Sequence, residues 1–134
     1  MKQQRMSRRA FLNAGGDAAK GSCIILTMPM ILAACDQAND ARMKNSDFQL
    51  LSEEEVLEYS AISARIIPSN DTPGATEAGV IYFIDTVFAH NREGEHQIFK
   101  EGLATLQSEG AAQFGVASFY LLNEEQQDQL LRQI

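Results

Sequence analysis

Cysteine is scarce in this sequence. Only two cysteines, Cys23 and Cys35, occur in a chain of 134 residues. The chain has no C-x-x-C pair and no C-x-x-C-H site for covalently attached haem. Because both cysteines precede residue 36, the remainder of the chain has no cysteine pair for a disulfide and no thiolate cluster for an iron–sulfur centre.

Basic residues are also few beyond the N-terminal region. Residues 1–34 carry five basic side chains against one acidic, whereas residues 35–134 carry six basic against seventeen acidic. Nucleic-acid binding needs clustered Lys and Arg that replace counterions, so the acidic part is not expected to bind nucleic acid. Its charge favours solubility and repels an anionic membrane surface.

The sequence lacks a recognisable catalytic arrangement. The glycine-rich stretch AGGDAAKG, residues 14–21, precedes no strand–helix–strand unit and is no dinucleotide fingerprint. His90 and His96 are six residues apart and fall on different helix faces, which favours solvated side chains over a metal site. Asp71 and Asp85 could form an acid/base pair, but Asp71 beside Thr-Pro is better explained as a turn former. We therefore predict no catalytic, cofactor-binding or metal-binding residue.

No apolar run is long enough to span a membrane. The longest, Gly21–Ala34, has 14 residues. That corresponds to about 21 Å of helix, against roughly 30 Å of hydrocarbon. A basic segment precedes the run, which is the layout of a signal peptide. A buried core helix is the alternative, and the flanking basic cluster argues against it. We expect residues 1–34 to be a signal peptide.

The stretch SRRAFLN, residues 7–13, resembles the twin-arginine export motif. In that motif a receptor reads two arginines followed by large apolar residues. Asn13 stands where lysine is frequent. We expect the translocase to recognise Arg8, Arg9, Phe11 and Leu12.

The end of the apolar run, Leu32-Ala33-Ala34-Cys35, resembles a bacterial lipobox. Cys35 would then be the first residue after cleavage and would carry the lipid anchor. An ordinary signal with a chance cysteine is the alternative. Asp36 after the cysteine fits retention at the periplasmic side of the inner membrane. The polar residues that follow predict a flexible tether over 35–49.

Helical patterns fill residues 50–134. A capping box of Ser52 with Glu55 predicts a helix that ends before Pro68. Two further helices are expected at about Thr76–His90 and Glu93–Glu109, and GAAQFGVASFY, residues 110–120, as a loop or loose turn. A last helix begins after Asn123 and has no stop signal before Ile134, which suggests truncation or a missing partner. The predicted fold is all-α, a small domain of about four helices after the signal and tether.

Several stretches resemble the gluconate 2-dehydrogenase subunit 3 family. They are ARIIP, DTPGA, EAGV and FID, at residues 64–68, 71–75, 77–80 and 83–85. The similarity runs from about Leu50 to Ile134. It departs from the family at Asn70, where a second acid is frequent, and at Ile134, where relatives usually continue.

The resemblance implies a non-catalytic small subunit of a membrane-associated, FAD-dependent sugar or sugar-acid dehydrogenase. In that family the large subunit carries FAD, and a third subunit with c-type haem often passes electrons to quinone. The small subunit carries the export signal and helps the flavoprotein to mature and leave the cytoplasm through the twin-arginine translocase. That role explains why a short chain without a cofactor would carry a signal for folded cargo.

Two readings compete for the turn between the first two predicted helices. It is a connector, or it is also the surface offered to the flavoprotein, and the combination is favoured. The candidate interface residues are Pro68, Asp71, Thr72, Pro73, Gly74, Ala75 and Gly79. A free-standing periplasmic lipoprotein that binds a ligand or assists assembly is the alternative function, and an enzyme in its own right is less favoured.

Overall fold

The computed structural model describes residues 27–90 and 93–133. Within these ranges the chain forms six α-helices and one short 3₁₀ helix, with no strand, so the all-α prediction is confirmed. The helices are α2 (Met28–Lys44), α3 (Glu53–Ile66), α4 (Ala75–Ala78), α5 (Val80–Ala89), α6 (Glu93–Phe114) and α7 (Glu124–Leu131), with η2 at Phe119–Leu121.

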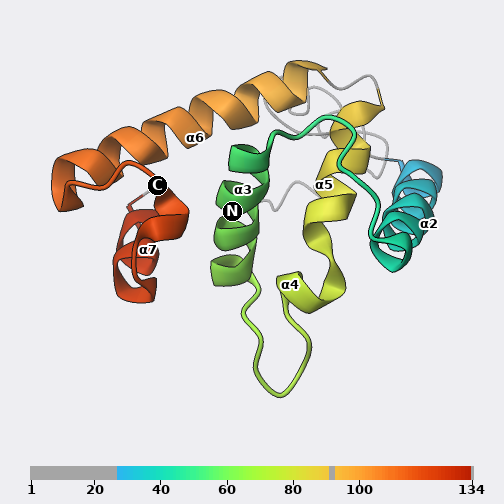
Figure 1. Cartoon of the computed structure of the whole chain (residues 1–134), viewed down its shortest axis with the longest axis horizontal. Coiled ribbons are helices and arrows are strands. Elements are labelled where there is room, and N and C mark those ends of the chain that lie inside the picture. The colour runs from blue at the N-terminus through green and yellow to red at the C-terminus, as the bar shows by residue number, and fades with distance from the viewer. Residues whose placement is uncertain (1–26, 91–92, 134) are drawn as a thin grey trace, which may run out of the picture.

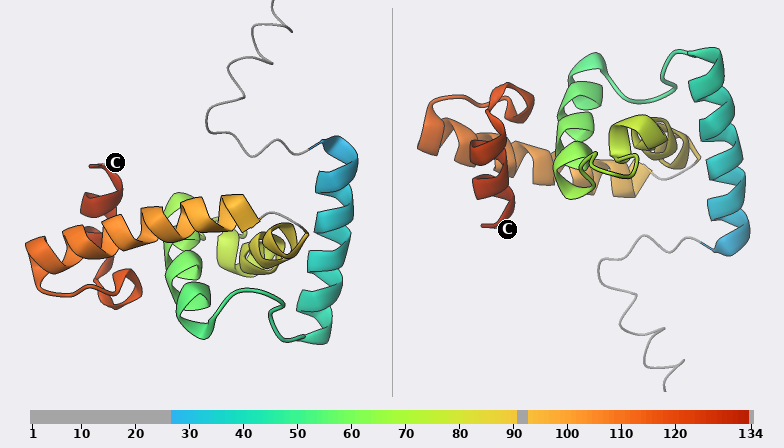
Figure 2. Two further views of the ribbon diagram at one scale, coloured as in Figure 1. Left: turned by 90° about the horizontal axis from the view of Figure 1, so that it is seen from above. Right: turned by 90° about the horizontal axis from the view of Figure 1, so that it is seen from below.

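The long helix α6 runs along one side of the molecule, across the ends of α3 and α5 (Figure 1). Helix α2 lies against α5 at one end of the long axis, and α7 lies near the opposite end. Figure 2 shows the same order from above and below, with α3 and α5 between these two end helices. The helices therefore form a single elongated arrangement rather than a parallel bundle.

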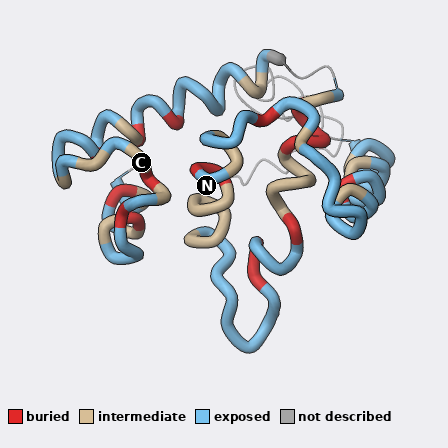
Figure 3. The backbone as a smooth tube through the Cα atoms, viewed as in Figure 1, coloured by how far each residue is buried: buried red, intermediate tan, exposed pale blue. Residues whose placement is uncertain are grey.

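Two apolar clusters hold the helices together. One contains Leu51, Tyr59, Val87, Phe88 and Leu103, and it joins α3, α5 and α6. The other contains Leu106, Phe119, Leu122 and Leu130, and it fixes η2 and α7 against α6. The tube coloured by burial in Figure 3 shows the buried positions on the inward sides of these elements. Burial of a side chain such as Phe119 stabilises the fold by about 1.5–3 kcal/mol.

The predicted helix starts are confirmed. Ser52 Oγ accepts a hydrogen bond from Glu55 N, and Glu55 Oε2 accepts one from Ser52 N, which is the expected capping box of α3. Asn123 and Gln126 form the same reciprocal pair at α7. Helix α3 ends before Pro68, because a residue that precedes proline disfavours helical geometry.

The helix expected at Thr76–His90 is broken in the structure. Gly79 has φ +68° and ψ +35°, a left-handed conformation that ends α4 and starts α5 in a new direction. The prediction of one continuous helix was wrong at this glycine. Helix α6, in contrast, continues past the expected Glu109 to Phe114 and ends before Gly115, whose φ is +72°.

The expected flexible tether also differs from the structure. Residues 36–44 belong to α2, which begins within the expected signal segment and continues past Cys35. The polar composition of this stretch suggested a spacer, yet Ala38 is buried and Arg42 bonds to α4, so tertiary contacts hold the helix. Pro29 near its start fits the first turn of a helix, where no backbone donor is needed.

Candidate functional site

The turn between α3 and α4 is the site that the sequence singled out. Pro68, Asp71, Thr72 and Pro73 are exposed, while Gly74, Ala75 and Gly79 are buried. The loop projects beyond the ends of α3 and α4 (Figure 1). The first four residues can therefore meet a partner, and the last three shape the turn from inside.

The turn is braced by its own hydrogen bonds. Asn70 Oδ1 accepts from Thr72 N at 3.0 Å, a local turn that short polar side chains favour. Glu77 Oε2 accepts from Gly74 N at 3.0 Å and also from the Ser69 hydroxyl, and these bonds hold the pKa of Glu77 below its ordinary value. Ala75 N donates to Ile67 O at 2.9 Å and closes the loop at its base.

Gly74 is required by close packing against the backbone, and Gly79 is required by its backbone conformation. A Cβ on Gly74 would lie 2.6 Å from Ile67 O and Ser69 N, which are backbone atoms. A Cβ on Gly79 would lie 2.4 Å from Arg42 Cδ and would also be strained by the positive φ. The structure thus assigns Gly74 and Gly79 an intramolecular role as connectors.

Two apolar side chains beside the turn were missed at the sequence level. Ile66 is 67% exposed and Ile67 is 51% exposed, at the end of α3 and the base of the turn. The spacing of apolar residues every three to four positions along α3 includes both isoleucines and by itself predicts that they are buried. The only sequence signal against burial was Pro68, which ends the helix before its last turn can pack.

The two aspartates do not form a pair. Asp71 is exposed in the turn. Asp85 on α5 is 3% exposed, and its carboxylate accepts hydrogen bonds from the backbone N–H groups of Gln49, Leu50 and Leu51. Asp85 therefore anchors the segment that leads into α3, and the turn-former interpretation of Asp71 fits its position.

A second buried carboxylate, Glu58 on α3, was not predicted. It is fully buried and accepts hydrogen bonds from Gln107 Nε2 at 2.8 Å, Phe119 N at 3.1 Å and Tyr120 N at 3.0 Å. Satisfaction by three donors is what a buried carboxylate requires. Like Asp85, Glu58 is occupied in holding a loop.

The histidines are bonded within the chain. His90 Nδ1 lies 2.6 Å from Thr86 O, and His96 Nε2 lies 2.6 Å from Glu55 Oε1. Burial would raise the pKa of Glu55, but hydrogen bonds from Ser52 and His96 outweigh it and lower the pKa below its ordinary value. Among the described residues no cluster of three His, Cys, Asp or Glu side chains could hold a metal ion.

Tyr59 lies near Glu55, and its ring packs edge to face against Phe99 with ring centroids 6.0 Å apart. Its hydroxyl is buried and has no hydrogen-bond partner in the described structure. Burial, together with the negative charges of Glu55 and Glu58, raises the pKa of Tyr59 to about 12. Its hydroxyl therefore stays protonated at neutral pH and supplies no base.

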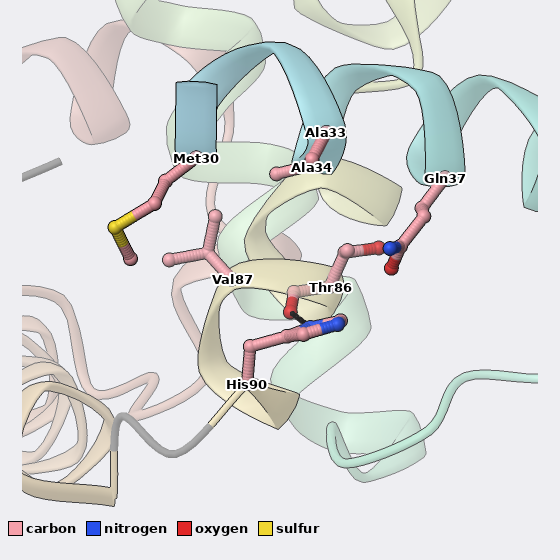
Figure 4. Close-up of a pocket in the computed structure, with 7 residues that line it drawn as sticks. All are labelled: Met30, Ala33, Ala34, Gln37, Thr86, Val87 and His90. Carbon is pink, nitrogen blue, oxygen red and sulfur yellow. Dashed lines mark hydrogen bonds between the residues drawn. The ribbon is translucent and has the colours of Figure 1, made fainter. Parts of the chain in front are cut away.

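A small cavity of about 130 Å³ lies between α2 and α5 (Figure 4). Its lining residues are Met30, Ala33, Ala34, Gln37, Thr86, Val87 and His90. On α5, Thr86 Oγ1 donates to Tyr82 O and His90 Nδ1 bonds to Thr86 O, and most of the cavity lining is apolar. The cavity is thus an apolar gap between two helices and offers a polar ligand little to bind.

The expected signal-recognition residues Arg8, Arg9, Phe11 and Leu12 lie outside the described residues. Cys35 is described, and its side chain is exposed on α2 as a free thiol. None of the helices in the described part of the chain is both long and apolar enough to cross a bilayer.

Comparison with known families gives one result. The family model described as Gluconate 2-dehydrogenase subunit 3 matches residues 52–134, which is more than half of the chain. No curated protein and no solved structure matches. The matched range begins at the Ser52 cap of α3 and includes the braced turn.

Proposed function

The chain belongs to the gluconate 2-dehydrogenase subunit 3 family, and from that membership we propose that it is the non-catalytic small subunit of a membrane-associated, FAD-dependent sugar or sugar-acid dehydrogenase. In this proposal the partner subunit binds FAD and performs the oxidation, and a third subunit with c-type haem accepts the electrons. The chain itself helps the flavoprotein to mature and to leave the cytoplasm.

A role through surface contacts is supported by how the ionisable side chains are used. Glu58, Asp85 and His96 each bond to a distant part of the same chain. A general acid or base needs access to a substrate proton, and these groups are buried or engaged in structural bonds. Catalysis is therefore assigned to the partner.

The braced, exposed turn between α3 and α4 carries the proposal. We define the turn surface as Ile66, Ile67, Pro68, Asp71, Thr72 and Pro73, all of which are exposed. Its hydrogen bonds hold the backbone in place before any partner arrives, which reduces the entropy lost on binding. Exposed isoleucines beside such a turn suit an apolar patch on the large flavoprotein subunit.

Export and anchoring belong to the same proposal. The twin-arginine motif at Arg8 and Arg9 would carry the folded complex across the membrane, and a lipid on Cys35 would hold it at the periplasmic side of the inner membrane. The exposure of the Cys35 thiol is compatible with modification.

Co-purification tests the turn surface directly. The chain with Ile66→Ser and Ile67→Ser should lose most of the flavoprotein that co-purifies with the unchanged chain, because the apolar contact is removed. Ile98→Ser is the matched control, since Ile98 is 62% exposed on α6, away from the turn. Helix content by circular dichroism confirms folding. Equal flavoprotein recovery with the double variant would contradict the proposal.

A further inference from the structure

The segment that joins Cys35 to α3 contacts the rest of the molecule at successive points. Ala38, three residues after Cys35, is 6% exposed and lies on helix α2, which packs against α5. Helix α2 is thereby held against α5, which it crosses in the two views of Figure 2. Cys35 itself points away from this contact and is exposed.

Arg42 makes the second attachment. Its Nη1 donates to Glu77 O on α4 at 2.6 Å, and its Nη2 donates to Asn39 Oδ1 at 3.0 Å. The aliphatic part of the same side chain passes over Gly79, where a Cβ would lie 2.4 Å from Arg42 Cδ. The left-handed joint between α4 and α5 thus provides the space in which Arg42 lies.

The residues after α2 make the third attachment. Asn45 ends the helix in a left-handed conformation, and Ser46 N bonds back to Ala41 O. Phe48 stacks on Tyr82 with ring centroids 4.9 Å apart. Asp85 then binds the N–H groups of three consecutive residues, 49–51, and leads the chain into the cap of α3.

We propose that residues 35–51 form a rigid mount, which fixes the body of the protein relative to whatever group Cys35 carries. Contacts at Ala38, Arg42, Phe48 and Asp85 leave no stretch of this segment free to act as a hinge. A tether would let the body rotate, whereas the mount holds one orientation.

The mount would fix how the protein is oriented on a membrane, and this step rests on the proposed lipid at Cys35. Cys35 is exposed on α2, the helix that forms one end of the molecule along its long axis. A bilayer joined at Cys35 would therefore lie at the α2 end of the molecule. The body would extend from it toward α7, which lies near the other end of the long axis (Figure 1).

Spin-label distances test the mount in the full chain without lipid or partner. Cys23→Ser leaves Cys35 as the one native cysteine, and Ala112→Cys adds a second exposed site near the end of α6. The mount predicts one narrow distance distribution by double electron–electron resonance. A fifteen-residue flexible tether predicts a spread on the order of 20 Å, which would overturn the proposal.

A pair of variants tests the Arg42 attachment. Arg42→Ala should broaden the distribution, because it removes the bond to Glu77 and the packing over Gly79. Lys44 is exposed at the end of α2, two residues after Arg42, and Lys44→Ala should leave the distance distribution unchanged. A folded Arg42→Ala chain with an unchanged narrow peak would overturn the role assigned to Arg42.

Mass measurement of Cys35 in isolated membranes separates this inference from the proposed function. A narrow distance peak together with unmodified Cys35 would support the mount but contradict the proposed orientation on the membrane. A broad peak with lipidated Cys35 overturns the mount and leaves the anchoring proposal in place.

Discussion

Single buried carboxylates hold the irregular segments of this protein in place. Glu58 lies on α3, yet two of its three hydrogen-bond donors are the backbone N–H groups of Phe119 and Tyr120, about sixty residues later in the chain. Asp85 does the same for residues 49–51. Buried N–H groups outside regular helices need such acceptors, because an unpaired one costs free energy.

Removal of the Glu58 carboxylate should destabilise the fold strongly. Glu58→Ala leaves Phe119 N, Tyr120 N and Gln107 Nε2 without their acceptor, and we expect a loss of about 3 kcal/mol in unfolding free energy. Urea denaturation followed by circular dichroism measures it. Glu54→Ala, on the exposed side of α3, should change stability by less than about 0.5 kcal/mol. A similarly small effect at Glu58 would contradict its role.

The sequence did not identify these two carboxylates. Glu58 follows three acidic residues at the start of α3, and local pattern alone makes it look like another solvated helix side chain. Its burial depends on a loop more than sixty positions away. Asp85 was noticed, but as a possible partner of Asp71, because no local signal points to the backbone of residues 49–51.

At the scale of elements, helix starts were predictable and helix packing was not. The Ser52 and Asn123 caps are local, since each needs only a partner three residues on. The break at Gly79 is accompanied by the packing of Arg42, which is 37 positions earlier, and no short window of sequence contains both. Docking of α2 on α5 is likewise a tertiary effect that overrides a polar, spacer-like composition.

Helices α3 and α6 are linked by a contact between Glu55 and His96, and the lowered pKa of Glu55 makes stability depend on pH. Glu55 Oε1 lies 2.6 Å from His96 Nε2, and their side chains are 12% and 14% exposed. His96 also stacks on Phe88 with ring centroids 5.2 Å apart. The carboxylate of Glu55 thus serves both the cap of α3 and the contact with α6.

Because the pKa of Glu55 is lower in the folded protein than its ordinary value of 4.5, its carboxylate contributes stability above that pH. The contribution is lost as the pH falls through the lowered folded-state pKa. The difference in unfolding free energy between the unchanged chain and Glu55→Gln should therefore be largest above about pH 4.5 and shrink below it. Denaturation at stepwise pH measures this difference. Gln97→Ala removes no ionisable group, so its effect on the unfolding free energy should be the same at every pH. An effect of Glu55→Gln that is also independent of pH would contradict the argument.

At the scale of the whole molecule, the described residues from Cys35 onward form an acidic helical body with a braced, partly apolar turn surface. Family membership, the fold class and the exposed turn agree with a chain that works by contact with a larger subunit. The family resemblance could be recognised from the stretches around residues 64–85. The exposure of Ile66 and Ile67 could not, because it depends on how far α4 and α7 reach along α3.

The escort role is the central claim, and export of the flavoprotein tests it most directly. Arg8→Lys together with Arg9→Lys should abolish twin-arginine recognition, and Arg5→Lys, outside the pair, is the matched control. Flavin-dependent dehydrogenase activity is then measured in cytoplasmic and periplasmic fractions. The account predicts that the activity remains in the cytoplasm with the double variant and reaches the periplasm with the control. Normal periplasmic activity with the double variant would contradict it, because the flavoprotein would then be exported without this chain.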